Sequence, residues 1–171
     1  MHDKPLGASL YVPATHKDLP AIADGERMAS LRSVIFCTED AVAERDLERA
    51  LASLARTLEA MRAEGRLDRF VRVRNPAVLA RVLAMPGAAK LAGFGIPKAT
   101  RDNLDDYLRP LAGTRHLLMP TLETAEVFDP VEMRALRLRL QEPDIAHRIL
   151  PLRIGGNDLL GLLGLRRPRA M

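Results

Sequence analysis

Residues 149–165 read ILPLRIGGNDLLGLLGL, and this stretch decides the fold class. An apolar run ends at Gly155-Gly156, the chain then presents Asn157 and Asp158, and a leucine-rich run with helical spacing follows. This order predicts a β-strand, a tight turn and the start of a helix. In parallel α/β proteins, functional side chains gather at the carboxyl ends of strands. Asp158 is therefore the first candidate for a functional residue, and the alternative is that it only caps the next helix.

The same alternation of strand and helix signals recurs along the rest of the chain. Short β-type runs lie at 9–13, 31–37, 69–74, 91–97 and 116–121, ahead of the run that opens at 149. The segments between them are too long for hairpin turns, which predicts a parallel sheet built from βα units. The sequence has neither a GxGxxG turn after the first strand nor a GxxxxGK[ST] loop, so the nucleotide-binding forms of such a sheet are disfavoured.

Several helices carry clear signals of their own. Apolar residues at 47, 51, 54, 58 and 61 follow one another at intervals of four and three, which places them on one helical face, and Gly65 is expected to end that helix. Asn75-Pro76 and Asp129-Pro130 each combine a capping side chain with a proline at the first helical position. Both pairs predict the start of a helix.

Each predicted strand is followed by a polar or charged side chain, as at the catalytic face of a TIM barrel. These residues are Thr15, Asp40, Arg74, Lys98, Glu123 and Asp158. A complete (β/α)8 barrel has eight strands and about 250 residues. We therefore expect the 171 residues to form one α/β domain, 1–171, that is an incomplete TIM barrel of about six βα units. Its first and sixth strands would be open edges, through which we expect the chain to self-associate as a homo-oligomer.

Composition narrows the classes of function. The 26 Lys and Arg residues are interleaved with 22 acidic residues, and only 4% of the chain is aromatic, which argues against nucleic-acid binding. No apolar run approaches the roughly 20 residues of a membrane span, and the amino-terminal residues lack a signal-peptide pattern, so we expect a cytoplasmic protein without membrane contact. The single Cys37 excludes an internal disulfide and is expected in the core. His116 and His147 precede strands and are interpreted as structural.

Six motifs carry a resemblance to a known family. They are LYVPAT at 10–15, TEDAV at 38–42, FVRVRNP at 70–76, GFGIPKAT at 93–100, LMPTLET at 118–124 and LRIGGNDLLGLLGLRR at 152–167. In this order the chain resembles the HpcH/HpaI aldolase and citrate lyase beta-subunit superfamily. It is most similar to the bacterial branch described as a carbon–carbon bond lyase of the TIM-barrel fold.

The resemblance implies a Mg²⁺-dependent lyase or aldolase, with Mn²⁺ as a possible substitute, that acts through an enolate on a keto acid or a hydroxyacyl-CoA. In the family, a glutamate after the fifth strand and an aspartate after the sixth bind the metal, and these correspond to Glu123 and Asp158. The family's arginine of strand three matches Arg72 or Arg74, which share a face, and the sequence leaves that choice open.

The other site assignments rest on the same resemblance and on simple chemistry. The family's acidic pair matches Glu39 and Asp40, although the residue before the pair departs from the family motif. Lys98 would act as a point charge, and Gly155 and Gly156, followed by Asn157, would let backbone groups approach a substrate carboxylate. The alternative interpretations are a solvated Lys98, an ordinary loop acid at Glu123 and arginines that only form ion pairs inside the barrel.

The missing strands and the motif departure at Thr38 also support a second function of a different class. In that interpretation the chain is a truncated, catalytically inactive binding or assembly module with the same fold.

Overall fold

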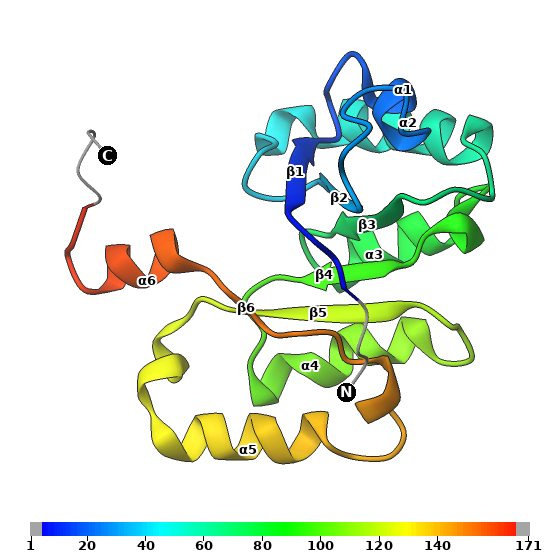
Figure 1. Ribbon diagram of the computed structural model, residues 1–171. Helices are drawn as coiled ribbons and strands as arrows, with labels where there is room; N and C mark the ends of the chain where they lie inside the picture. Colours follow the sequence, from blue (N-terminus) through cyan, green and yellow to red (C-terminus); the bar gives the residue numbers. More distant parts are fainter. Residues whose placement is uncertain (1–4, 167–171) are drawn as a thin grey trace.

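The computed structural model describes residues 5–166 and contains a six-stranded parallel sheet that curls into part of a barrel (Figure 1). Strand order follows the sequence, and each strand pairs with the next one along the chain. The strands are β1 Ser9–Pro13, β2 Ser33–Cys37, β3 Asp68–Arg72, β4 Gly93–Ile96, β5 Leu117–Leu122 and β6 Arg153–Ile154. Arg167, which ends the last sequence motif, lies outside the described residues.

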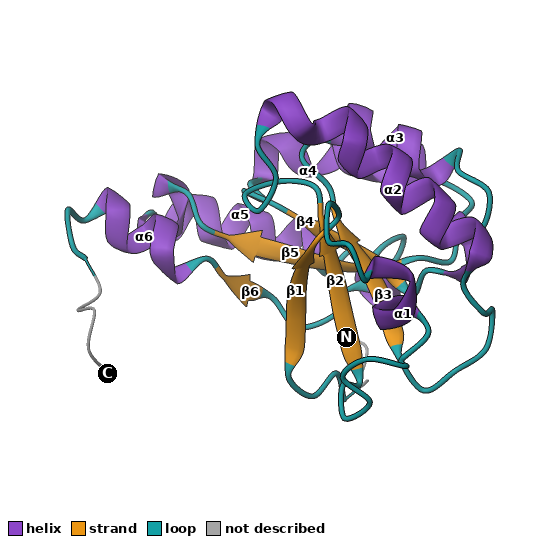
Figure 2. Ribbon diagram, turned by 90° about the horizontal axis from the view of Figure 1, so that it is seen from above, coloured by secondary structure: helices purple, strands orange, loops and turns teal. Residues whose placement is uncertain are grey.

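α-Helices follow the strands, and all but the last of them cover the outside of the curled sheet (Figure 2). They are α1 Leu19–Ala23, α2 Leu47–Ala60, α3 Pro76–Leu83, α4 Arg101–Leu108, α5 Pro130–Leu140 and α6 Gly156–Leu162. Both views show that α6 projects away from the rest of the molecule, with β1 and β6 as the two edges of the sheet. This is the incomplete TIM barrel that the sequence predicts.

Two apolar layers hold the sheet in place. The larger one lies between the sheet and the outer helices and includes Val34, Phe36 and Leu54, all fully buried. Side chains alternate along β2, so that Ile35 points to the inner face and joins Phe70 of β3 in a smaller cluster. Burial on both faces explains why β2 reads as a continuous apolar run.

The predicted helix starts are confirmed. The side chain of Asn75 accepts a hydrogen bond from Val78 N at 2.9 Å at the start of α3, and Pro76 occupies the first helical position. Asp129 caps α5 by accepting from Val131 N. Each cap satisfies a backbone donor that the first turn of a helix leaves without a partner.

Several boundaries differ from the predicted ones, and three of them have a clear physical reason or bear on the site. Helix α2 ends at Ala60, before Gly65, because the buried Met61 adopts an extended backbone. Strand β3 ends at Arg72, two residues earlier than expected. Strand β6 shrinks to two residues, since Pro151 has no N–H to donate and interrupts the pairing that begins at an isolated bridge of Ile149.

Within residues 5–166, no helix combines the length and the apolar content that a membrane span requires.

Candidate functional site

The candidate site lies where the carboxyl ends of the strands meet. Arg72 is the last residue of β3, and Glu123 follows β5 directly. Glu39 and Lys98 each lie two residues beyond a strand, after β2 and β4. Parallel pairing in register brings these four side chains to the same end of the sheet.

Arg72 is the centre of this cluster. Its Nη2 atom lies 2.7 Å from Glu39 Oε2, 3.1 Å from Asp40 Oδ2 and 2.8 Å from Glu123 Oε1. The arginine is 8% exposed and Glu123 is 3% exposed, so both charges are largely removed from water. Such pairing offsets the cost of burying charge.

Lys98 supports the same carboxylates in two ways. Its Nζ atom lies 2.8 Å from Glu39 Oε1, and its backbone N–H donates to Glu123 Oε1 at 2.8 Å. The backbone of Lys98 has φ of 49°, a left-handed conformation that non-glycine residues rarely adopt. The short connection between β4 and α4 is therefore held in an uncommon shape that presents an N–H group to Glu123.

The surroundings shift the pKa values of these carboxyl groups in different directions. Burial alone would raise the pKa of Glu39, but Lys98 and Arg72 outweigh it and hold that pKa below its ordinary value. Burial raises the pKa of Glu123 against the opposing effects of Lys98 N–H and Arg72, and the charge of Asp158 acts in the same direction as burial. A carboxyl group with a raised pKa gains strongly from a cation placed beside it.

Arg74 has a different role from Arg72 in this structure. Its guanidinium donates to the backbone carbonyl oxygens of Thr38, Glu39 and Val42, which lie in the segment after β2. Thr38, the motif departure, is fully buried and donates its hydroxyl to Arg72 O at 3.0 Å. Of the two arginines, Arg72 is the one that contacts the site carboxylates, whereas Arg74 and Thr38 fix the backbone that carries them.

A cavity of about 240 Å³ opens beside Arg72 and Glu123. It is lined by Tyr11, Asp40, Arg72, Thr121, Glu123, Arg153, Ile154, Gly155, Gly156, Asn157 and Asp158. Most of the predicted site residues therefore share one cavity, whereas Glu39, Arg74 and Lys98 do not line it. Asp158 lies in the first turn of α6 without capping it through its side chain.

The donor set at this cavity fits a hard divalent cation. Glu123 Oε2 is buried and has no hydrogen-bond partner, although Oε1 of the same carboxylate has two. Asp158 lines the same cavity. Mg²⁺ is commonly held by one or two carboxylates together with water and substrate oxygens. Across residues 5–166, no group of three or more His, Cys, Asp or Glu side chains is placed to hold a metal ion.

Gly155 is required by packing at this point. A Cβ atom at Gly155 would overlap the Glu123 side chain, so a larger residue cannot stand there without moving that carboxylate. The N–H of Gly155 donates to Leu122 O at 2.9 Å and extends the pairing between β5 and β6. The backbone N–H of Gly155 is therefore already used in a hydrogen bond of the sheet.

Sequence reasoning missed Tyr11, Thr121 and Arg153. A signal was available for Thr121, because it lies two residues before Glu123 in LMPTLET and alternation places the two side chains on one face. Arg153 pairs in register with Thr121, a relation that only the strand register reveals. Tyr11 lies on the edge strand β1, and both Arg72 and Arg153 lie over its ring.

Solved structures of similar fold span a longer chain. The chain matches Haloferax volcanii malate synthase in a lead(II) complex with a TM-score of 0.77 and 16% identity, covering 100% of this chain and 56% of that one. It matches the Mycobacterium tuberculosis citrate lyase beta subunit, complexed with oxaloacetate and magnesium, with a TM-score of 0.62 and 22% identity, covering 95% and 64%. RipC from Yersinia pestis gives a TM-score of 0.60 and 17% identity, covering 92% and 61%. The chain thus spans between half and two thirds of these structures.

One of the two sequence comparisons identifies a family with this fold. No curated protein sequence matches the chain. The family model for carbon–carbon bond lyases of the TIM-barrel fold matches residues 1–171. Together with the curled parallel sheet and the carboxylates at its carboxyl edge, this match assigns the chain to the family of carbon–carbon bond lyases of the TIM-barrel fold.

Proposed function

We propose that this chain provides the site of a Mg²⁺-dependent carbon–carbon lyase or aldolase that acts on a keto acid or a hydroxyacyl-CoA, with Mn²⁺ as a possible substitute. The observation that carries the proposal is the buried Oε2 of Glu123, which has no hydrogen-bond partner, in a residue that lines one cavity together with Asp158 and Arg72. Membership of a lyase family supports the same reaction class.

The chemistry of the reaction explains why these residue types are suitable. Cleavage of a carbon–carbon bond next to a carbonyl leaves negative charge on an enolate, and positive groups that face this charge lower the barrier. Mg²⁺ held by Glu123 and Asp158 would supply part of that positive charge. The carboxylate contacts of Arg72 all use Nη2 and its Nε is buried, so Nη1 would be the nitrogen that meets a substrate oxygen.

Each carboxylate around Arg72 has a distinct task in this proposal. Glu39, held by Lys98, fixes the orientation of the Arg72 guanidinium. Asp40 contacts the same Nη2 atom but is half-exposed and lines the cavity, where it can meet the substrate directly. Asn157 and Gly156 complete the rim on the side of α6.

Calorimetric titration of Mg²⁺ and Mn²⁺ in the presence of pyruvate tests this proposal. We expect binding by the unmodified chain and its loss in Glu123→Gln and in Asp158→Asn, because each change removes an anionic oxygen ligand. Glu59→Gln is the matched control, since Glu59 is exposed on α2 and should not affect binding. Unchanged metal binding in both site variants would contradict the proposal.

A second candidate function is supported by the exposed apolar surface near α6. Ile154 is 64% exposed, and Leu162, Leu163 and Leu165 are each more than half exposed. Together with the open edges β1 and β6, these residues favour an assembly module in which copies of the chain associate.

Sedimentation velocity at several concentrations tests this second candidate. We expect a homo-oligomer whose dissociation is promoted in the double variant Leu162→Lys, Leu163→Lys. A monomer at all concentrations would contradict self-association. Metal-dependent turnover of a β-hydroxyacyl thioester or a 2-keto-3-deoxy acid would contradict the idea that the module is inactive.

A further inference from the structure

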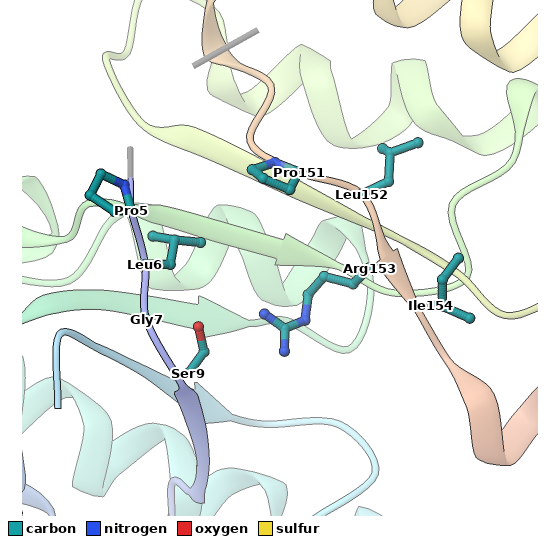
Figure 3. Close-up of a pocket in the computed structure, with 8 residues that line it drawn as sticks. All are labelled: Pro5, Leu6, Gly7, Ser9, Pro151, Leu152, Arg153 and Ile154. Atoms are coloured by element: carbon teal, nitrogen blue, oxygen red, sulfur yellow. The ribbon is translucent and has the colours of Figure 1, made fainter. Parts of the chain in front are cut away.

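The outer face of the sheet is poorly covered at β6. Figure 3 shows Leu152 and Ile154 on one side of the chain and Arg153 on the other. Leu122 of β5 pairs in register with Ile154, so the two side chains share a face, and Leu122 belongs to the apolar layer between the sheet and the helices. Leu152 is nevertheless 42% exposed and Ile154 is 64% exposed. An apolar surface that helices cover elsewhere therefore reaches solvent at this edge.

A groove beside α5 continues this surface. Its volume is about 390 Å³. Four of its lining residues, Met133, Leu136, Arg137 and Leu140, follow one another on α5 at the positions i, i+3, i+4 and i+7. This spacing forms the face with which one helix packs against another, so the groove suits a helix that lies beside α5. The remaining lining residues are Leu122, Gln141, Ala146, Ile149, Leu150 and Leu152.

Helix α6 offers the matching surface. Leu159, Leu162 and Leu163 are spaced at i, i+3 and i+4, which is the spacing of anchor residues in a helix that docks into an apolar groove. No residue of α6 is buried, and Leu162 and Leu163 are 54% and 56% exposed. Figures 1 and 2 show that α6 points away from α5. A contiguous exposed apolar surface of this kind marks an interaction site.

Charge favours the same pairing. Arg137 is the one charged residue that lines the groove, and it is exposed. Residues 156–165 contain no basic residue and a single acid, Asp158. The stretch around α6 therefore brings no positive charge to the arginine of the groove.

The α6 helix of the same chain is held away from this groove. Gly155 is the only residue between β6 and α6, and its N–H donates to Leu122 O at 2.9 Å. Asn157 and Asp158 in the first turn of α6 line the cavity at the carboxyl end of the sheet. The groove instead follows α5 to its last residue, Leu140. Folding α6 back into it would remove Asp158 from that cavity, whereas a second copy can supply its helix without this loss.

We infer that α6 of one copy docks in the groove beside α5 of a second copy, with Leu162 and Leu163 against the apolar face of α5. This inference rests on the assembly function proposed above and specifies the surface that it uses. A stable interface buries about 800 Å² on each partner. Helix α6 has seven residues and is only about 10 Å long, so one contact is too small. A twofold dimer, in which each copy gives a helix and accepts one, doubles the contact.

Sedimentation velocity on two matched variants tests the groove. Leu152→Lys changes an exposed leucine that lines it, whereas Leu138→Lys changes a leucine of α5 that is 53% exposed and lies outside it. We expect Leu152→Lys to raise the dissociation constant of the dimer about tenfold or more, because a charge would enter an apolar contact. Leu138→Lys should leave it unchanged. Equal melting temperatures of the two variants exclude unfolding as the cause.

Disulfide cross-linking tests the exchange between copies. Arg137→Cys and Leu163→Cys are made in chains with tags of different length, which are then mixed and oxidised. Cys37 is buried, so its thiol does not compete. We expect a covalent heterodimer, and a much lower yield when Leu138→Cys takes the place of Arg137→Cys.

The outcomes separate this inference from the assembly function. A monomer at every concentration would overturn both. A dimer that Leu152→Lys leaves unchanged, and that gives no heterodimer on oxidation, would overturn the groove alone and keep the assembly function. A disulfide that forms only within one chain carrying both cysteines would place α6 in its own groove and overturn the exchange.

Discussion

At the scale of single residues, the contact between Gly155 and Glu123 is the most restrictive feature of the site. Replacing Gly155 by alanine would place a methyl group on the Glu123 side chain, at an otherwise ordinary backbone conformation. We expect Gly155→Ala to displace the Glu123 carboxylate and weaken Mg²⁺ binding about tenfold or more, because metal affinity is sensitive to ligand orientation.

The matched control for this prediction is Gly161→Ala near the end of α6. A Cβ atom at Gly161 meets nothing within 4 Å, and alanine favours the helix, so metal binding should not change. Equal metal affinity of the two variants, measured by calorimetry, would show that the close approach at Gly155 does not position Glu123.

The candidate site could be predicted from the sequence only in part. Glu123 and Asp158 were identifiable because each follows a strand-like run and matches a family motif. Arg72 and Arg74 could not be separated, because side-chain alternation gives them the same face and the end of β3 at Arg72 depends on tertiary pairing. Thr121 carried a weak signal in its spacing from Glu123.

At the scale of elements, the start of α3 depends on a single side chain. The side chain of Asn75 accepts a hydrogen bond from Val78 N. Arg74, the preceding residue in the sequence, donates to the backbone of Val42 in the segment after β2. Asn75→Ala removes the cap, and we expect it to reduce the free energy of unfolding by about 1 kcal/mol.

Urea denaturation checks this expectation, and Asn75→Asp is the control that keeps an oxygen acceptor in place. The aspartate variant should retain most of the stability, since aspartate caps helices about as well as asparagine. An equal decrease in the free energy of unfolding in both variants would contradict the capping role of Asn75.

Element types were more predictable than element lengths. Helix α2 was clear because its apolar residues repeat at intervals of four and three, and they are buried as expected. Strand β6 was overestimated because Pro151 interrupts the pairing in a run that is apolar throughout. The leucines of α6 predicted the helix but not its packing, since none of its residues is buried in the structure.

At the scale of the whole molecule, stability should depend on pH through the buried His116. Its Nε2 atom lies 3.1 Å from Ala88 O, its ring packs edge-on against Phe94, and Arg115 and Arg148 are the charged groups nearby. Burial lowers the pKa of His116 below its ordinary value of 6.5, so the unfolded chain binds more protons than the folded chain at mildly acidic pH. The folded state therefore keeps its full stability above about pH 6.5 and loses part of it as the pH falls further.

Chemical denaturation between pH 5 and pH 8 measures this dependence. His116→Gln keeps a nitrogen donor near the position of Nε2 but cannot take up a proton, so the variant should show a weaker loss of stability on acidification. His147→Gln changes an exposed histidine and should behave like the unmodified chain. If the stability of His116→Gln depended on pH as that of the unmodified chain does, His116 would not be the source of the pH dependence.

The sequential order of strands also bears on how the chain folds. Ser9 pairs with Ser33 and Ser33 with Asp68, so each new strand joins the one made just before it. Because the entropy of loop closure grows with separation, pairing each strand with its neighbour in sequence costs less than pairing it with a more distant strand. During synthesis on the ribosome, each βα unit can add to an edge that already exists. The nascent chain therefore never has to wait for a distant segment before its sheet begins to grow.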